Sequence, residues 1–158
     1  GAAILALAPQ IRAPRREVFL LDERPLRMLA ATDVGGIEAA AIPAGNRSFV
    51  VARVILALSS VTGGLSGNLA NLDFAAGLAA ASAVELSVGD ADLLVPKIDS
   101  TGTGRIRGIS NAATSFIPVD ADSTSLWLNF SASIVADGTA LVTGVVELTY
   151  FDLGSPLV

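Results

Sequence analysis

The sequence predicts an all-β protein: an antiparallel β-sandwich, with a jelly roll as its expected form and an irregular N-terminal arm. Short apolar segments recur along the chain, and several alternate at the two-residue period of a strand. Gly, Asn, Asp and Pro residues separate these segments at short intervals, as the turns of a sandwich require. Apolar residues make up 52% of the 158 residues, which is enough for the core of one domain.

We expect the irregular arm over residues 1–35 and the sandwich domain over residues 36–158. Regular structure in the arm is interrupted by three prolines, Pro9, Pro14 and Pro25. Within the arm, the apolar residues 18–21 predict a short strand added to a sheet edge. The arm is expected to lie along the body of the domain or along a neighbouring chain.

Two strands are predicted at the start of the domain. Residues 37–42 form the first, and the Pro-Ala-Gly-Asn sequence of residues 43–46 predicts the turn that closes it. Residues 48–58 form the second and clearest strand, which is apolar on both faces. It is therefore expected to be central and covered on both sides. Arg53 in such a strand requires a carboxylate partner or an exit to solvent.

The middle of the chain predicts loops and short strands. Residues 59–68 and 100–104 are rich in Gly, Ser and Thr and predict loops, and the Ala-rich residues 75–83 fit either a helical turn or a tight connection. Short strands are expected at residues 69–74, 84–88, 93–98, 105–110 and 115–119.

The last third predicts a hairpin. Residues 126–134 alternate between apolar and polar, as in a half-buried antiparallel strand. The inward side chains are expected to be Leu126, Leu128, Phe130 and Ile134. Asp137-Gly138 is a hairpin turn signal, and the following strand over residues 140–151 also has one apolar face. Two such strands need a second sheet to cover them.

Charge is scarce and unevenly distributed. Charged residues make up 16% of the chain, against about 25% in a typical domain, so we infer that other subunits cover much of its surface. The alternative is a domain whose surface residues are mostly small, so that other chains need not cover its surface. Residues 1–30 carry five Arg and three acids, whereas residues 31–158 carry five basic and twelve acidic residues. The acidic body argues against nucleic-acid binding, and the basic arm is either solvated or docked on an acidic neighbour.

The residue types needed for most catalytic and metal sites are missing. The chain has no His and no Cys, which excludes disulfides and thiolate metal sites. Carboxylate pairs occur at Asp90/Asp92 and Asp120/Asp122, where capping of turns is favoured over Ca²⁺ binding. Lys97 is expected at a solvated strand end. No catalytic residue, cofactor or metal is expected, and the protein is not expected to be an enzyme.

No membrane contact is expected either, because no apolar run reaches about 18 residues. The apolar residues 1–8 lack the basic residues that precede the apolar stretch of a signal peptide.

Trp127 falls on the polar side of its predicted strand. An outward Trp anchors an interface or stacks on a sugar in many proteins. Burial under the arm or under a loop is the alternative, and the sequence leaves both open.

Residues 42–54, Ile-Pro-Ala-Gly-Asn-Arg-Ser-Phe-Val-Val-Ala-Arg-Val, resemble a pattern of tailed-bacteriophage virion proteins. In that pattern a short Ile-Pro-Ala-Gly turn leads into a long apolar strand. A loop rich in Thr, Gly, Ser and Asn follows, here residues 61–68, and a strand like residues 141–150 ends the module. The resemblance covers roughly residues 36–152.

The resemblance implies a jelly-roll virion module, often trimeric, that acts as a capsid decoration (cement) protein or belongs to a fibre or spike. We therefore expect a structural protein on the capsid surface that stabilises the shell. Its expected partners are the major capsid protein, other virion proteins and further copies of itself. The simplest such modules start directly with the sandwich, so the arm is a departure. The expected contact residues are Arg12, Arg15 and Arg16 of the arm together with Trp127. The alternative is a fibre or spike tip that binds a glycan or host receptor through residues 61–68 and 99–104.

Overall fold

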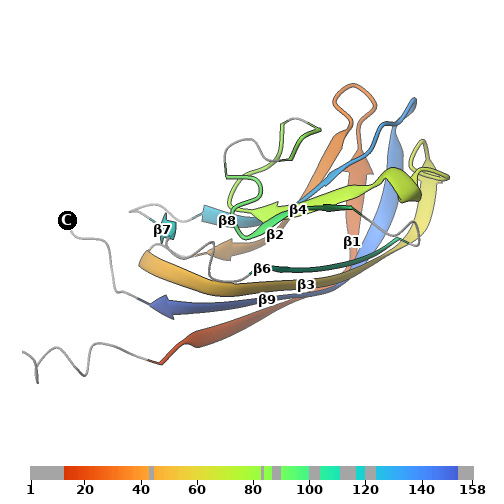
Figure 1. Ribbon diagram of the computed structural model, residues 1–158. Helices are drawn as coiled ribbons and strands as arrows, with labels where there is room; N and C mark the ends of the chain where they lie inside the picture. The colour runs from red at the N-terminus through yellow and green to blue at the C-terminus, as the bar shows by residue number, and fades with distance from the viewer. Residues whose placement is uncertain are drawn as a thin grey trace, which may run out of the picture.

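Two antiparallel sheets packed face to face form the protein (Figure 1). The computed structural model describes residues 13–42, 45–82, 84–86, 90–99, 104–110, 117–119 and 124–152. The strands within these residues are β1 (Arg15–Met28), β2 (Val34–Ile42), β3 (Gly45–Gly63), β4 (Asp73–Gly77), β5 (Val95–Asp99), β6 (Arg105–Ser110), β7 (Ile117–Val119), β8 (Thr124–Ser131) and β9 (Gly138–Asp152). A short 3-10 helix, Leu69–Asn71, precedes β4. The predicted all-β sandwich is confirmed.

The strand order is that of a jelly roll. The first sheet has the order β1-β9-β3-β6, with the short β7 also paired to β3, and the second has the order β2-β8-β4-β5. The chain changes sheet at most connections, so neighbours within a sheet come from distant parts of the sequence. Two interleaved four-stranded orders of this kind define the jelly roll, which confirms the expected topology.

The core lies between the inner faces of the two sheets. Phe74 and Phe130 meet edge to face in the second sheet, with ring centroids 5.2 Å apart. Phe49 and Tyr150 form a tilted pair in the first sheet at 5.7 Å. All four predicted inward side chains of the 126–134 segment are buried: Leu126, Leu128, Phe130 and Ile134.

The expected irregular arm is wrong from Arg15 onward. Residues 15–28 form β1, which pairs antiparallel with β9 from Arg15 opposite Tyr150 to Met28 opposite Gly138. Proline has no backbone N–H group to donate to a neighbouring strand. Pro25 is tolerated because β1 is the edge strand of its sheet. A β-bulge between Leu21 and Arg24 interrupts the register. The sandwich therefore begins well before residue 36.

The predicted hairpin around Asp137-Gly138 is also wrong. β8 pairs with β2 and β4, whereas β9 pairs with β1 and β3, so residues 132–137 carry the chain from one sheet to the other. Asp137 accepts a hydrogen bond from the Ala30 N–H at 2.9 Å, and Asp33 accepts one from the Ile134 N–H at 3.1 Å. These bonds join the corner to the β1–β2 turn instead of closing a local hairpin.

Three smaller expectations are corrected. Residues 84–86 form a turn and not a strand, and residues 69–71 form the 3-10 helix ahead of β4. β3 is central in its sheet as predicted, but the described residues leave its outer face uncovered at Ile55, which is 42% exposed. Arg53 on that face reaches solvent, which is one of the two outcomes expected for it.

Candidate functional site

The outer face of the second sheet is partly closed by the chain itself. Asn129 on β8 is completely buried, although its polar position predicted exposure. Its side-chain amide donates to the carbonyls of Ala79 at 2.9 Å and Ala91 at 3.0 Å, and its oxygen accepts the Ala81 N–H at 3.0 Å. Ser131 donates to the Val84 carbonyl at 2.9 Å. The connection between β4 and β5 is therefore bonded to this face of β8.

Trp127 lies on the same face of β8 and is half-buried. It is opposite Glu38 of β2 and Gly77 of β4. A Cβ atom added at Gly36 would lie 3.4 Å from the Trp127 ring, so the missing side chain there makes room for the indole. The contact role predicted for Trp127 stays a prediction.

Two of the three predicted arginines, Arg15 and Arg16, lie in a strand and not in a free arm. Arg15 and Arg16 open β1 and form ion pairs with Asp152 at 3.7 Å and Glu147 at 3.0 Å. These pairs are on the first sheet, whereas Trp127 is on the second, so the structure does not bring the predicted contact residues together. Arg12 lies outside the described residues.

An exposed apolar row crosses the outer face of the first sheet. Leu20 of β1 is 80% exposed and pairs with Val145 of β9, which pairs with Ile55 of β3. Val18, two residues before Leu20 on the same face, is 47% exposed. Monomeric surfaces rarely expose contiguous apolar patches of large area, and such patches mark contact sites. The prediction of residues 18–21 as a strand at a sheet edge is confirmed by β1, but the sequence did not predict which side chains of that strand are exposed.

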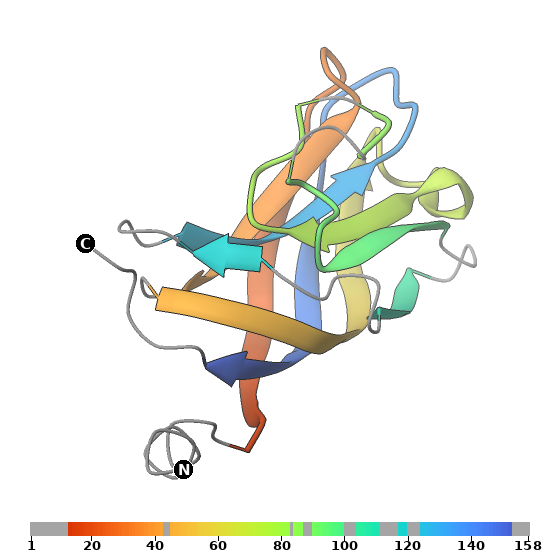
Figure 2. The ribbon, with the colours of Figure 1, turned by 60° about the vertical axis from the view of Figure 1, so that its left-hand side comes forward.

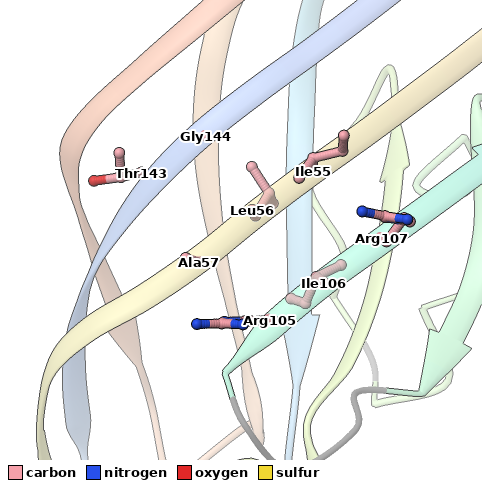
Figure 3. A pocket seen from close by; sticks show the side chains of 8 residues that line it. All are labelled: Ile55, Leu56, Ala57, Arg105, Ile106, Arg107, Thr143 and Gly144. Atoms are coloured by element: carbon pink, nitrogen blue, oxygen red, sulfur yellow. The ribbon is translucent and has the colours of Figure 1, made fainter.

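Arginines border this row on β3 and β6. Arg53, Arg105 and Arg107 are exposed, and none of them forms an ion pair with another described residue. Figure 3 shows Arg105 and Arg107 beside Ile55 around an open depression of about 270 Å³. A neighbouring depression beside Arg53 measures about 330 Å³, at the lower end of the about 300–1,000 Å³ of small-molecule sites, and both depressions are open at the surface instead of enclosed. A protein surface is a better match for this face than a small ligand.

A second polar cluster joins three strands at one end of the first sheet. Tyr150 of β9 donates its hydroxyl to Glu17 of β1, and the guanidinium of Arg47 of β3 lies 5.5 Å from the centre of the Tyr150 ring. Burial and the Glu17 hydrogen bond raise the pKa of Tyr150, and Arg47 opposes that shift. Because Tyr150 and Arg47 are buried, we assign this cluster a structural role.

The acidic residues form no metal site within the described ranges. Asp73 lies 3.1 Å from Lys97, which is therefore paired instead of simply solvated. Burial and a hydrogen bond with Asp99 raise the pKa of Asp73, and Lys97 opposes the shift. No group of three or more metal-ligating side chains occurs among the residues described, which include Asp90 and Asp92. Asp120 and Asp122 lie outside them.

The described part of the chain contains no helix with the length and apolar character needed to cross a membrane.

Comparisons with known proteins find similarity only among solved structures. No protein-family model and no curated protein matches the chain. The infectious bursal disease virus VP2 subviral particle matches over 92% of this chain and 39% of its own, with 8% identity and a TM-score of 0.46. The capsid of Helicobacter pylori bacteriophage KHP30 matches over 90% of this chain and 95% of its own, with 9% identity and a TM-score of 0.37. The capsid of cyanophage Pam1 matches over 87% and 85%, with 14% identity and a TM-score of 0.40. At TM-scores below 0.5, none of these matches carries an argument about function.

Proposed function

We propose that the chain is a structural virion protein of a bacteriophage, which decorates and stabilises the capsid through protein–protein contacts at its surface. Its partners would be the major capsid protein or other virion proteins, and it would assemble as a homo-oligomer, with a trimer as the expected form. The observation that carries this proposal is the exposed apolar row of Val18, Leu20, Val145 and Ile55 on the first sheet.

Three further features support the proposal. Jelly rolls form viral capsid domains as well as lectin and cupin domains, so the strand order is compatible with a virion role without establishing it. The resemblance of residues 36–152 to tailed-phage virion proteins favours the first of these classes. The low share of charged residues, 16%, fits a chain whose surface is covered by neighbours.

The mechanism would be additive binding. Each copy would bury apolar side chains against the shell and against its own symmetry mates, and would thereby stabilise the assembled state by mass action. No chemical step is required, and the surface arginines Arg53, Arg105 and Arg107 would select acidic neighbours.

The test is the position and copy number of the chain on the particle with which it co-purifies, by electron cryo-microscopy and quantitative mass spectrometry. Many copies in lattice positions on the shell are expected. A few copies at a vertex, tail or fibre would instead favour the receptor-binding alternative. Absence from purified particles would overturn both. An Ile55→Asp variant should bind the particle more weakly than Val135→Asp, which makes the same kind of change at a 99% exposed apolar residue between β8 and β9.

One observation keeps the glycan-binding alternative open to a direct test. Trp127 is half-buried and lies opposite the exposed Glu38 of β2, and an aromatic ring with a neighbouring carboxylate can hold a sugar. Binding in a glycan array that disappears in Trp127→Ala would support glycan binding. An array without binding would favour the capsid role instead.

A further inference from the structure

The free edge of β1 carries two exposed apolar side chains, Leu20 at 80% and Val18 at 47%. β1 stands at the end of the first sheet, with β9 on one side and no described strand hydrogen-bonded along residues 15–21 on the other. β2 approaches the second half of β1, where Arg24 donates to the Glu38 carbonyl at 2.7 Å, and the Leu29–Val34 bridge follows directly after β1. Figures 1 and 2 show the first half of β1 at the margin of the sheet. An edge of this kind offers unpaired N–H and C=O groups to another strand.

The sequence of this edge is complementary to itself when it is reversed. Residues 16–22 read Arg-Glu-Val-Phe-Leu-Leu-Asp, with Phe19 at the centre. If two copies run antiparallel with Phe19 opposite Phe19, Arg16 of each copy lies opposite Asp22 of the other. Val18 of each copy then lies opposite Leu20 of the other.

We propose that β1 pairs with β1 of a second copy about a two-fold axis at Phe19. The two first sheets would become one continuous sheet, and the exposed apolar row would run across the contact. Arg16 of each copy would pair with Asp22 of the other. These two ion pairs would flank four apolar side chains on the outer surface, Val18 and Leu20 of both copies. Arg16 already contacts Glu147 at 3.0 Å, and its side chain, 65% exposed, has donors to spare for a second carboxylate.

Other registers are less favourable. Directly opposed residues share a face of the sheet, so a shift by one residue would place outward side chains against inward ones. A shift by two residues would place Arg16 opposite Leu20 in one direction and Val18 opposite Asp22 in the other. Asp22 and Glu23 form the bulge, so regular pairing would run from Arg16 to Leu21, and Arg16 of one copy would meet Asp22 of the other where the bulge begins.

This contact does not depend on a virion role. It is two-fold, so it would join two single copies or link one trimer to another. Failure of the proposed function would leave a chain that still self-associates, and failure of this proposal would leave particle binding intact.

The register can be tested with single cysteines, since the full chain contains none. Phe19→Cys places two thiols directly opposite each other, at a Cα separation of about 5 Å, within the range that a disulfide spans. In Val18→Cys and in Leu20→Cys, the Cα atoms of the two cysteines, one from each copy, would lie about 8 Å apart, which is beyond that range. Mild oxidation should therefore cross-link Phe19→Cys and neither of the other two. Cross-linking of Val18→Cys or Leu20→Cys instead, or of none of the three, would overturn the proposed pairing.

The charges can be tested by reversal and rescue. Arg16→Asp and Asp22→Arg each place like charges opposite each other, and each should raise the dimer dissociation constant by at least about tenfold in sedimentation velocity. The double variant Arg16→Asp with Asp22→Arg restores opposite charges across the two-fold axis and should recover dimerisation. Arg107→Asp, the same charge change on β6, is the matched control and should dimerise like the wild type. Circular dichroism checks that every variant is folded. A wild type that stays monomeric at all concentrations, or a double variant no better than either single one, would overturn the proposal.

Discussion

Asn129 on β8 donates its side-chain amide to the carbonyl of Ala91 at 3.0 Å, across 38 residues of sequence. The same side chain bonds Ala79 and Ala81, so one buried amide joins a strand of the second sheet to both ends of the connection between β4 and β5. A buried polar group of this kind is stabilising only while all of its partners are in place. The second sheet thus has a cover formed by the chain, whereas among the described residues Leu20 and Ile55 stay exposed on the outer face of the first sheet.

We predict that Asn129→Ala lowers the free energy of unfolding by about 3 kcal/mol, because three backbone groups lose their partner. Ser131→Ala removes one bond and should cost about 1 kcal/mol. Chemical denaturation measures both, and limited proteolysis should show new cleavage between β4 and β5 in Asn129→Ala. Ser125→Ala, whose hydroxyl bonds the exposed Glu38, is the control on the same strand. A loss in Asn129→Ala no larger than in Ser125→Ala would contradict the assigned role.

The single tyrosine of the chain is predicted to titrate above its ordinary value of 10.0 in the folded protein. Burial disfavours the phenolate, and the Glu17 carboxylate adds to this effect. Since the folded-state pKa is raised, the resulting stability is present below pH 10.0 and is lost as the pH rises through the folded-state pKa. Ultraviolet absorbance of the tyrosinate, in native and denatured protein, measures the difference.

Glu17→Gln should move the Tyr150 midpoint back toward 10.0, because it removes the neighbouring negative charge. Glu147→Gln also removes one negative charge, but from a side chain of β9 that does not contact the Tyr150 hydroxyl, so it should leave the Tyr150 midpoint unchanged. A native midpoint equal to that of the denatured chain would show that Tyr150 is not held as described.

Asp137 is predicted to make stability depend on acid pH. The Ala30 N–H, and then Arg27, lower the pKa of this carboxyl from 3.8. The contribution is therefore present above pH 3.8 and is lost as the pH falls through the folded-state pKa. Asp137→Asn should be less stable than the wild type above pH 3.8, and the difference should shrink in more acidic solution. Denaturation over a pH series measures it.

Arg27→Gln leaves the Ala30 hydrogen bond in place, so it should reproduce only the smaller part of the effect. A difference between Asp137→Asn and the wild type that stays constant through the acid range would contradict the assignment.

Gly144→Ala is predicted to be strongly destabilising. A Cβ atom there would lie 2.1 Å from the Ile55 carbonyl oxygen of β3, which is backbone and cannot rotate away. β9 is held between β1 and β3, so it can move only by breaking one ladder. We expect a loss of more than about 3 kcal/mol in urea denaturation. The neighbouring exposed substitution Thr143→Ala is the control, and equal stability of the two variants would contradict the packing.

Strand positions were predictable where the signal is local. The segments 37–42, 48–58 and 140–151 each lie within an observed strand or overlap one closely, because a two-residue alternation is a property of the segment itself. The hairpin predicted at Asp137-Gly138 was wrong because the same dipeptide also occurs where a chain passes from one sheet to another. Pro25 contributed to the incorrect prediction of an irregular arm, because a proline that would break a central strand is tolerated in an edge strand.

The contact residues were harder to predict than the strands. Arg15 and Arg16 were assigned to an arm, yet they open an edge strand with carboxylate partners. The exposed row around Leu20 gave no signal, because an apolar residue in a strand is normally taken as core. Its exposure depends on which strands lie beside it, and no short segment specifies that.

By itself, the sequence determined that this chain is all-β and contains no His or Cys, since alternation, turn residues and composition are local or additive properties. Only the tertiary structure decided that β8 and β9 belong to different sheets, that Asn129 is buried and that Leu20 is exposed. Each of these depends on contacts between residues far apart in the chain. Such contacts form through the packing of two whole sheets, so the surroundings of a side chain follow from the assembled fold and not from its own neighbours in sequence.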